Sequence, residues 1–123
     1  MSDAMTVVAD FCAAWSRRDV DELLGFFTDD AVYHNIPIDP VQGKDGIRSM
    51  LQLFVPPSEE ISFEVLHIAS AGDVVLTERV DRFRMGGKDV VLPVSGTFEI
   101  RDGKIAAWRD YFDMGAWTRQ TSG

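Results

Sequence analysis

The first half of the chain repeats its hydrophobic positions every three to four residues, which is the period of a helix that buries one face. This pattern predicts helices over residues 3–19, 19–27 and 43–54, and Asp19 fits the N-cap of the second helix. Residues 28–37 predict a loop that enters a short strand.

After residue 60 the period changes to two, which indicates strands whose side chains alternate between two faces. The strands are predicted near residues 61–70, 73–85, 88–100 and 104–113. The joins between them are pairs that tolerate a positive φ: Ala71-Gly72, Gly86-Gly87 and Asp102-Gly103. Consecutive hairpins of this kind form an antiparallel meander, and a short helix is expected to begin at Met114.

These elements predict a single α+β domain over residues 1–123, because the length fits one domain and helices precede a run of strands. The natural packing is a curved, mostly antiparallel sheet that closes over the helices. Such packing leaves an internal pocket between the sheet and the helices.

Composition and charge narrow the classes of function. The net charge of −8 is spread along the chain, so it disfavours nucleic acid and anionic membrane surfaces as partners. The first residues lack the pattern of a signal peptide, and no apolar run approaches the roughly 20 residues of a membrane span. A cytoplasmic location is therefore predicted. The single cysteine, Cys12, lies on a helical apolar stripe and is expected to be buried.

Charged residues interrupt two predicted strands on faces that are otherwise apolar. Arg79 and Asp81 share a face with Val75, Thr77 and Phe83. In the last strand, Asp110 is the only polar member of a row that includes Trp108. A lone buried carboxylate is costly unless a cation or a donor meets it, so Arg79 is the expected partner of Asp110.

The opposite faces of these strands carry charges that solvent exposure explains. Exposed cross-strand ion pairs, which contribute little to stability, suit Glu78, Arg82, Arg84 and Arg109. The same explanation stays open for Asp110, since structural ion pairs are also common among buried charges.

Tyr33 and Asn35 lie two residues apart, so they share a face of the early strand and could hold a small polar species such as water. His34 falls on the opposite face. Neither His34 nor His67 has the spacing of metal ligands, and no nucleotide-binding motif occurs, so no metal or cofactor is predicted.

A convergence of Asp81, Arg79 and Asp110 would place an acid and a base in one dry pocket. Two carboxyls that flank one guanidinium cannot both ionise cheaply, so one keeps its proton while the other stays charged. A water held by Tyr33 and Asn35 could then attack while the protonated carboxyl donates to a leaving oxygen. A strained apolar electrophile such as an epoxide suits this chemistry.

Three segments, YHNIP (33–37), TERVD (77–81) and GKIAAWRDYFD (103–113), resemble the signature segments of the limonene-1,2-epoxide hydrolase family. The resemblance implies an NTF2-like, cone-shaped α+β fold. It implies a water held by Tyr33, Asn35 and Asp110, with Asp110 as the base, Asp81 as the acid and Arg79 between the two carboxyls. It also implies one-step, cofactor-independent hydrolysis of an apolar epoxide to a vicinal diol, and a homodimer.

Two alternatives stay open on the same scaffold. One is a ketosteroid-isomerase-like or polyketide-cyclase-like enzyme, which needs one base beside a donor that stabilises an enolate. The other is a non-catalytic module that binds a small ligand, and it predicts exposed or unpaired charges at positions 79, 81 and 110.

Overall fold

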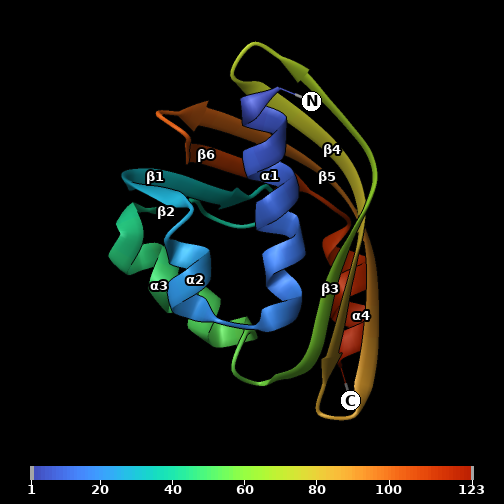
Figure 1. Cartoon of the computed structure of the whole chain (residues 1–123). Coiled ribbons are helices and arrows are strands. Elements are labelled where there is room, and N and C mark those ends of the chain that lie inside the picture. Colours follow the sequence, from blue (N-terminus) through green and yellow to red (C-terminus); the bar gives the residue numbers. More distant parts are fainter. Residues whose placement is uncertain (1, 123) are drawn as a thin grey trace.

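The fold is described from a computed structural model that covers residues 2–122 (Figure 1). The helical elements, in chain order, are α1 (Asp3–Ala14), η1 (Trp15–Arg17), α2 (Val20–Leu24), α3 (Gly43–Phe54) and α4 (Met114–Thr121). The strands are β1 (Phe27–Asn35), β2 (Val41–Gln42), β3 (Ser58–Ala71), β4 (Val74–Met85), β5 (Lys88–Arg101) and β6 (Lys104–Tyr111).

The first helices follow the predicted pattern, with earlier ends than expected. The predicted helix 3–19 ends as α1 at Ala14 and continues as one 3-10 turn, because Arg18 takes a left-handed φ of 54° that stops it. The predicted N-cap of α2 is confirmed, since the Asp19 side chain accepts a hydrogen bond from the Glu22 backbone N–H at 3.1 Å. The predicted helix over 43–54 matches α3.

The loop predicted for the first part of residues 28–37 is wrong, because β1 already begins at Phe27. Phe27 pairs in parallel with Ile105 of β6, and the register then shifts before Val32. Pairing with β6 at Phe27 and again at Val32 therefore keeps the polar residues between them within β1, although their sequence is typical of a loop. The two-residue strand β2 was not predicted, and it pairs with Val32 and Tyr33 of β1.

The sheet has six strands in the order β2-β1-β6-β5-β4-β3. The four predicted meander strands are confirmed as β3 to β6, and each joins the next in antiparallel register. Among the described residues, β1 and β6 form the only parallel pair of strands, so the sheet is mixed but mostly antiparallel. The turns between the strands contain residues with positive φ: Gly72, Gly86, Gly87, Asp102 and Gly103.

Strands β3 to β5 curve strongly, and α1 lies across their concave side (Figure 1). The core forms where α1 meets this side. The Phe11 ring packs edge-on against the Trp108 ring, with 5.0 Å between the ring centroids, and both side chains are fully buried. This aromatic layer forms the base on which the charged side chains of β4 and β6 rest.

The chain leaves β6 and enters α4, which confirms the short helix expected at Met114. Gln120 of α4 accepts a hydrogen bond from the Val91 backbone N–H at 2.7 Å and donates one to the Val91 carbonyl at 2.9 Å. Val91 lies on the part of β5 that β6 does not reach, so α4 covers that stretch of strand edge. Among residues 2–122, no helix is both long and apolar enough to span a membrane.

Candidate active site

Arg79 lies at the centre of the concave face of the sheet, and its side chain is 0% exposed. It extends from β4, where alternate residues point inward and form the buried row Val75, Thr77, Arg79 and Asp81. The guanidinium also packs on aromatic rings, with its Cζ atom 4.9 Å from the centroid of the Phe63 ring. A charge in this position needs partners, and the structure supplies them.

All five N–H groups of the Arg79 guanidinium have an acceptor. Nε and Nη2 donate to Oδ1 and Oδ2 of Asp81 at 3.0 and 2.8 Å. Nη1 and Nη2 donate to Oδ1 and Oδ2 of Asp110 at 3.1 and 2.8 Å. The remaining N–H of Nη1 donates to Thr77 Oγ1 at 3.2 Å. Arg79 therefore binds both carboxyls in bidentate geometry. Because all five donors are used, it has none left for another molecule.

Asp110 receives a further donor from its own strand. The indole Nε1 of Trp108 donates to Asp110 Oδ1 at 2.6 Å, so this carboxyl accepts three side-chain hydrogen bonds. Asp81 accepts two, both from Arg79. Both aspartate side chains are only 5% exposed. The two carboxyls therefore have different surroundings although they share one guanidinium.

Burial raises the pKa of Asp81 from its ordinary value of 3.8 to about 6, against the opposing effect of Arg79. Burial also opposes the charge of Arg79, but the nearby Asp110 and Asp81 outweigh it and raise the pKa of the guanidinium well above its ordinary value. Arg79 thus stays charged, and Asp81 can keep a proton at mildly acidic pH.

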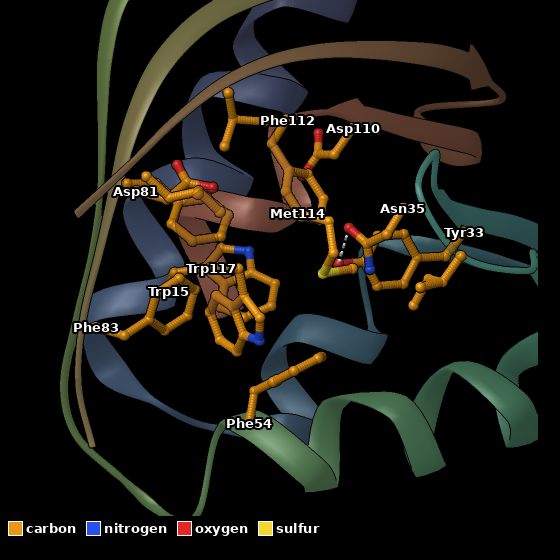
Figure 2. A pocket seen from close by; sticks show the side chains of 14 residues that line it. Trp15, Tyr33, Asn35, Phe54, Asp81, Phe83, Asp110, Phe112, Met114 and Trp117 are labelled. Carbon is orange, nitrogen blue, oxygen red and sulfur yellow. Dashed lines mark hydrogen bonds between the residues drawn. The ribbon is translucent and has the colours of Figure 1, made fainter. Parts of the chain in front are cut away.

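Tyr33 and Asn35 come from β1, the parallel neighbour of β6. The register pairs Tyr33 with Trp108 and Asn35 with Asp110, so β1 brings the two polar side chains beside the charged cluster. The Tyr33 ring stacks on the Trp108 ring, with 4.2 Å between the ring centroids. The Tyr33 hydroxyl donates to Asn35 Oδ1 at 3.2 Å (Figure 2). Burial raises the pKa of Tyr33, so the phenol remains a neutral donor.

A cavity of about 120 Å³ lies between the sheet, α3 and α4, and its polar lining consists of Tyr33, Asn35, Asp81 and Asp110. Figure 2 shows Asp81 on the left of the view and Asp110 with Asn35 on the right. Most of the remaining wall is apolar or aromatic: Trp15, Ile38, Phe54, Phe63, Phe83, Leu92, Val94, Phe112, Met114 and Trp117. Such a lining suits an apolar ligand that brings one reactive polar group to the carboxyls.

The structure brings together all five residues that the sequence singled out. Arg79, Asp81 and Asp110 are in direct contact, and Tyr33 and Asn35 line the same cavity as the two aspartates. Among the described residues, no direct hydrogen bond joins Asp110 to Tyr33 or Asn35. The burial of the charged cluster contradicts what a non-catalytic module predicted for positions 79, 81 and 110.

The other charged residues of these strands lie where the pattern placed them. Arg82 pairs with Glu64 at 2.7 Å and Arg109 with Glu99 at 2.6 Å, both on the outer face of the sheet. His34 bonds the Ile38 carbonyl at 2.9 Å. Cys12 is buried as predicted, and burial raises the pKa of its thiol to about 12, so the thiol is neutral.

Two members of the site were not predicted: Thr77, which accepts the fifth donor of Arg79, and Trp108, which donates to Asp110. The alternation of strand side chains puts each on the same face as its partner two residues away. That signal was present in the sequence, but hydrogen bonding within one strand depends on rotamers that the pattern does not specify.

The curved, open and mostly antiparallel sheet that packs over helices has the NTF2-like α+β fold. The chain belongs to the limonene-1,2-epoxide hydrolase family, because the family model described as "Limonene-1,2-epoxide hydrolase catalytic domain" matches residues 2–122. The family expected from the three segments is therefore confirmed.

Individual relatives agree with this assignment. The chain is 36% identical over 106 residues to the epoxide hydrolase EphG of Mycobacterium tuberculosis, a match that covers 85% of this chain and 69% of EphG. It is similar to a solved LEH-like epoxide hydrolase of M. tuberculosis, with 30% identity, a TM-score of 0.85 and coverage of 96% of this chain and 88% of that chain.

An NTF2-like protein of Burkholderia pseudomallei shares the fold with a TM-score of 0.89 over the whole of both chains. Its identity of 18% supports the fold alone.

Proposed function

We propose that this protein is a cofactor-independent epoxide hydrolase that adds water to an apolar, cyclic or aryl epoxide in one step to give a vicinal diol. The observation that carries the proposal is the bridge from Arg79 to Asp81 and Asp110 in a buried site. The membership in the epoxide hydrolase family supports the reaction class.

Asp110 is the base in this proposal. A water placed between Asp110, Tyr33 and Asn35 gives a proton to the Asp110 carboxylate as its oxygen attacks one carbon of the epoxide ring. The parallel register that sets Asn35 beside Asp110 supports this placement. The Tyr33 hydroxyl donates to Asn35 Oδ1, and burial keeps the phenol neutral, so its oxygen can accept the second O–H of the water and orient it.

Asp81 is the acid. The bond between the attacked carbon and the epoxide oxygen breaks, and that oxygen takes the proton of Asp81, which leaves a diol, a protonated Asp110 and an ionised Asp81. The resting state returns when Asp110 loses its proton and Asp81 gains one. The raised pKa of Asp81 supports this role, because a carboxyl that holds its proton to about pH 6 can donate it.

The charge balance of the cluster favours one proton on the two carboxyls. With Arg79 charged and one aspartate ionised, the buried cluster is neutral, whereas two ionised aspartates would leave a net negative charge in an apolar cavity. Arg79 has no free donor, so its part is to position both carboxyls rather than to bind the substrate oxygen.

The bridge formed by Arg79 also argues against an isomerase or a cyclase. Those reactions need one base beside one donor that stabilises an enolate, and they do not need a guanidinium that holds two carboxyls. Here Arg79 binds both Asp81 and Asp110 in bidentate geometry. The arrangement therefore favours a reaction that uses one carboxyl as an acid and the other as a base.

The test is to incubate the protein with styrene oxide and cyclohexene oxide in H₂¹⁸O and to follow the diols by mass spectrometry. Under single-turnover conditions we expect one ¹⁸O atom in the diol and none in the protein, because water attacks the ring directly. Label in an aspartate after one turnover would show a covalent ester and contradict the one-step reaction. A β,γ-enone that isomerises while no epoxide reacts would contradict the proposed function itself.

The homodimer and the cytoplasmic location stay predictions. Light scattering of the purified protein measures its mass in solution, and fractionation of the source cells locates it.

A further inference from the structure

The buried side of β5 has one position without a side chain. The inward row of this strand runs through Leu92, Val94, Gly96, Phe98 and Ile100, all buried. Gly96 lies in the middle of the row. A glycine inside a strand weakens the strand because it adds conformational entropy to the unfolded chain and contributes no packing.

Backbone conformation does not explain this glycine. The glycines of the chain that have a positive φ all lie elsewhere, and Gly96 is not among them. Its backbone can therefore accept any L-residue, so its reason must lie in the space above its Cα.

That space is occupied by the charged cluster. Gly96 pairs with Thr77 of β4 on one side and with Asp110 of β6 on the other. The side chain of Arg79 crosses β5 at this point on its way to Asp110. A Cβ atom on Gly96 would lie 2.6 Å from Asp110 Oδ1 and even closer to Arg79 Nη1. Real Cβ atoms essentially never approach another heavy atom to less than 3.0 Å.

We propose that Gly96 is a positioning residue for the acid–base pair: the missing side chain is the opening through which the guanidinium reaches Asp110. The effect of Gly96 on catalysis rests on the proposed epoxide hydrolase function. That Gly96 leaves room for the guanidinium, the geometric part of the proposal, rests on the contacts alone. Gly96 acts through Arg79 and Asp110 and does not lie among the residues that line the cavity.

The Gly96→Ala variant distinguishes this positioning role from a merely structural role in folding. The new methyl group displaces Nη1 from Asp110 and Thr77, while Nε and Nη2 can keep their bonds to Asp81. We expect kcat to fall at least 100-fold while KM for styrene oxide stays within threefold, because the apolar part of the cavity wall is unchanged. A merely structural role would lower the amount of folded enzyme without this split between kcat and KM.

The control is Ser95→Ala, one residue away on the exposed face of β5, which we expect to leave kcat and KM unchanged. If folded Gly96→Ala enzyme keeps kcat within threefold of the wild type, the positioning role is overturned.

A double-mutant cycle tests the geometric part without any catalysis. Melting temperatures are measured for the wild type, Gly96→Ala, Asp110→Ala and the double variant, and a variant that does not fold counts as maximally destabilised. We expect Gly96→Ala to lower the melting temperature strongly in the wild type and much less in Asp110→Ala, where the freed guanidinium can move aside. Equal losses in the two backgrounds overturn the proposal. The cycle decides this even if the protein hydrolyses no epoxide, an outcome that would defeat only the proposed function.

Discussion

Strand β4 carries arginine–carboxylate pairs on both of its faces, and the pairs have similar distances but very different exposure to solvent. On the inner face, Arg79 binds Asp81 and Asp110 with side chains that are 0% and 5% exposed. On the outer face, the Arg82 and Glu64 side chains are 47% and 52% exposed although their N–O distance is a similar 2.7 Å. Distance alone does not separate a surface ion pair from a candidate catalytic one.

The difference lies in solvent and in competition for donors. On the outer face water screens each charge. On the inner face two carboxyls that are almost fully buried share one guanidinium, and burial raises the pKa of Asp81 to about 6. The inner face can therefore hold a proton that a reaction can use.

The largest expected effect is on catalysis. Asp110→Asn removes the base and Asp81→Asn removes the acid, while each keeps the shape of the side chain. We expect each variant to lower kcat by about 10²–10⁴-fold, measured as diol formation from the epoxide that the wild type turns over. Glu64→Gln on the outer face is the matched control and should keep full activity. A variant of Asp81 or Asp110 with wild-type kcat would contradict the assigned role.

The second effect is on stability. Arg79→Met leaves two buried carboxyls without a counter-charge, so we expect the free energy of unfolding at pH 7 to fall by about 3–5 kcal/mol. Arg82→Met breaks an exposed pair and should cost less than about 1 kcal/mol. Urea denaturation of both variants measures the two losses. Similar losses would mean that the inner pair is no more than a surface ion pair.

The third effect is a pH dependence that only the inner face should show. Since the pKa of Asp81 is raised from 3.8 to about 6, its proton stabilises the folded state fully below pH 4, and this stabilisation is lost as pH rises through 6. The loss is on the order of 3 kcal/mol. Asn cannot ionise. The free energy of unfolding of Asp81→Asn, relative to that of the wild type, should therefore rise by about this much between pH 4 and pH 7. A constant difference across this range would show that the Asp81 pKa is not raised.

The smallest expected effect concerns the water site. Tyr33→Phe removes the hydroxyl but keeps the ring that stacks on Trp108. Because one of the hydrogen bonds proposed to hold the water is lost, we expect kcat to fall about tenfold, which corresponds to one hydrogen bond of about 1.4 kcal/mol. Steady-state kinetics of the purified variant measures this, and a change in KM alone would place Tyr33 in substrate binding instead.

Much of the fold and of the site follows from periodicity in the sequence. The two-residue period after residue 60 predicted the strands of the meander and put Arg79 and Asp81 on one inner face. The lone Asp110 in an apolar row predicted a buried partner, and Arg79 is that partner. These inferences succeed because strand side chains must alternate and buried charges must pair.

The remainder depended on contacts between distant segments. The start of β1 at Phe27 is held by parallel pairing with β6, which no local pattern predicts. The bond from Trp108 to Asp110 depends on rotamers, and the space above Gly96 becomes meaningful only when Arg79 is seen to cross it. A single glycine in the strand VLPVSGTF was visible in the sequence, but its neighbours on β4 and β6 were not.

The proposed reaction requires that one carboxyl of the buried pair keeps its proton while the other is charged. The most direct measurement is ¹³C NMR of protein labelled at the aspartate side-chain carboxyls, recorded from pH 4 to 8. We predict one buried carboxyl that is protonated at pH 5, titrates near pH 6 and disappears from the spectrum of Asp81→Asn. If the Asp81 and Asp110 carboxyls are both ionised at pH 5, the site holds no acid, and this result contradicts the proposed acid–base reaction.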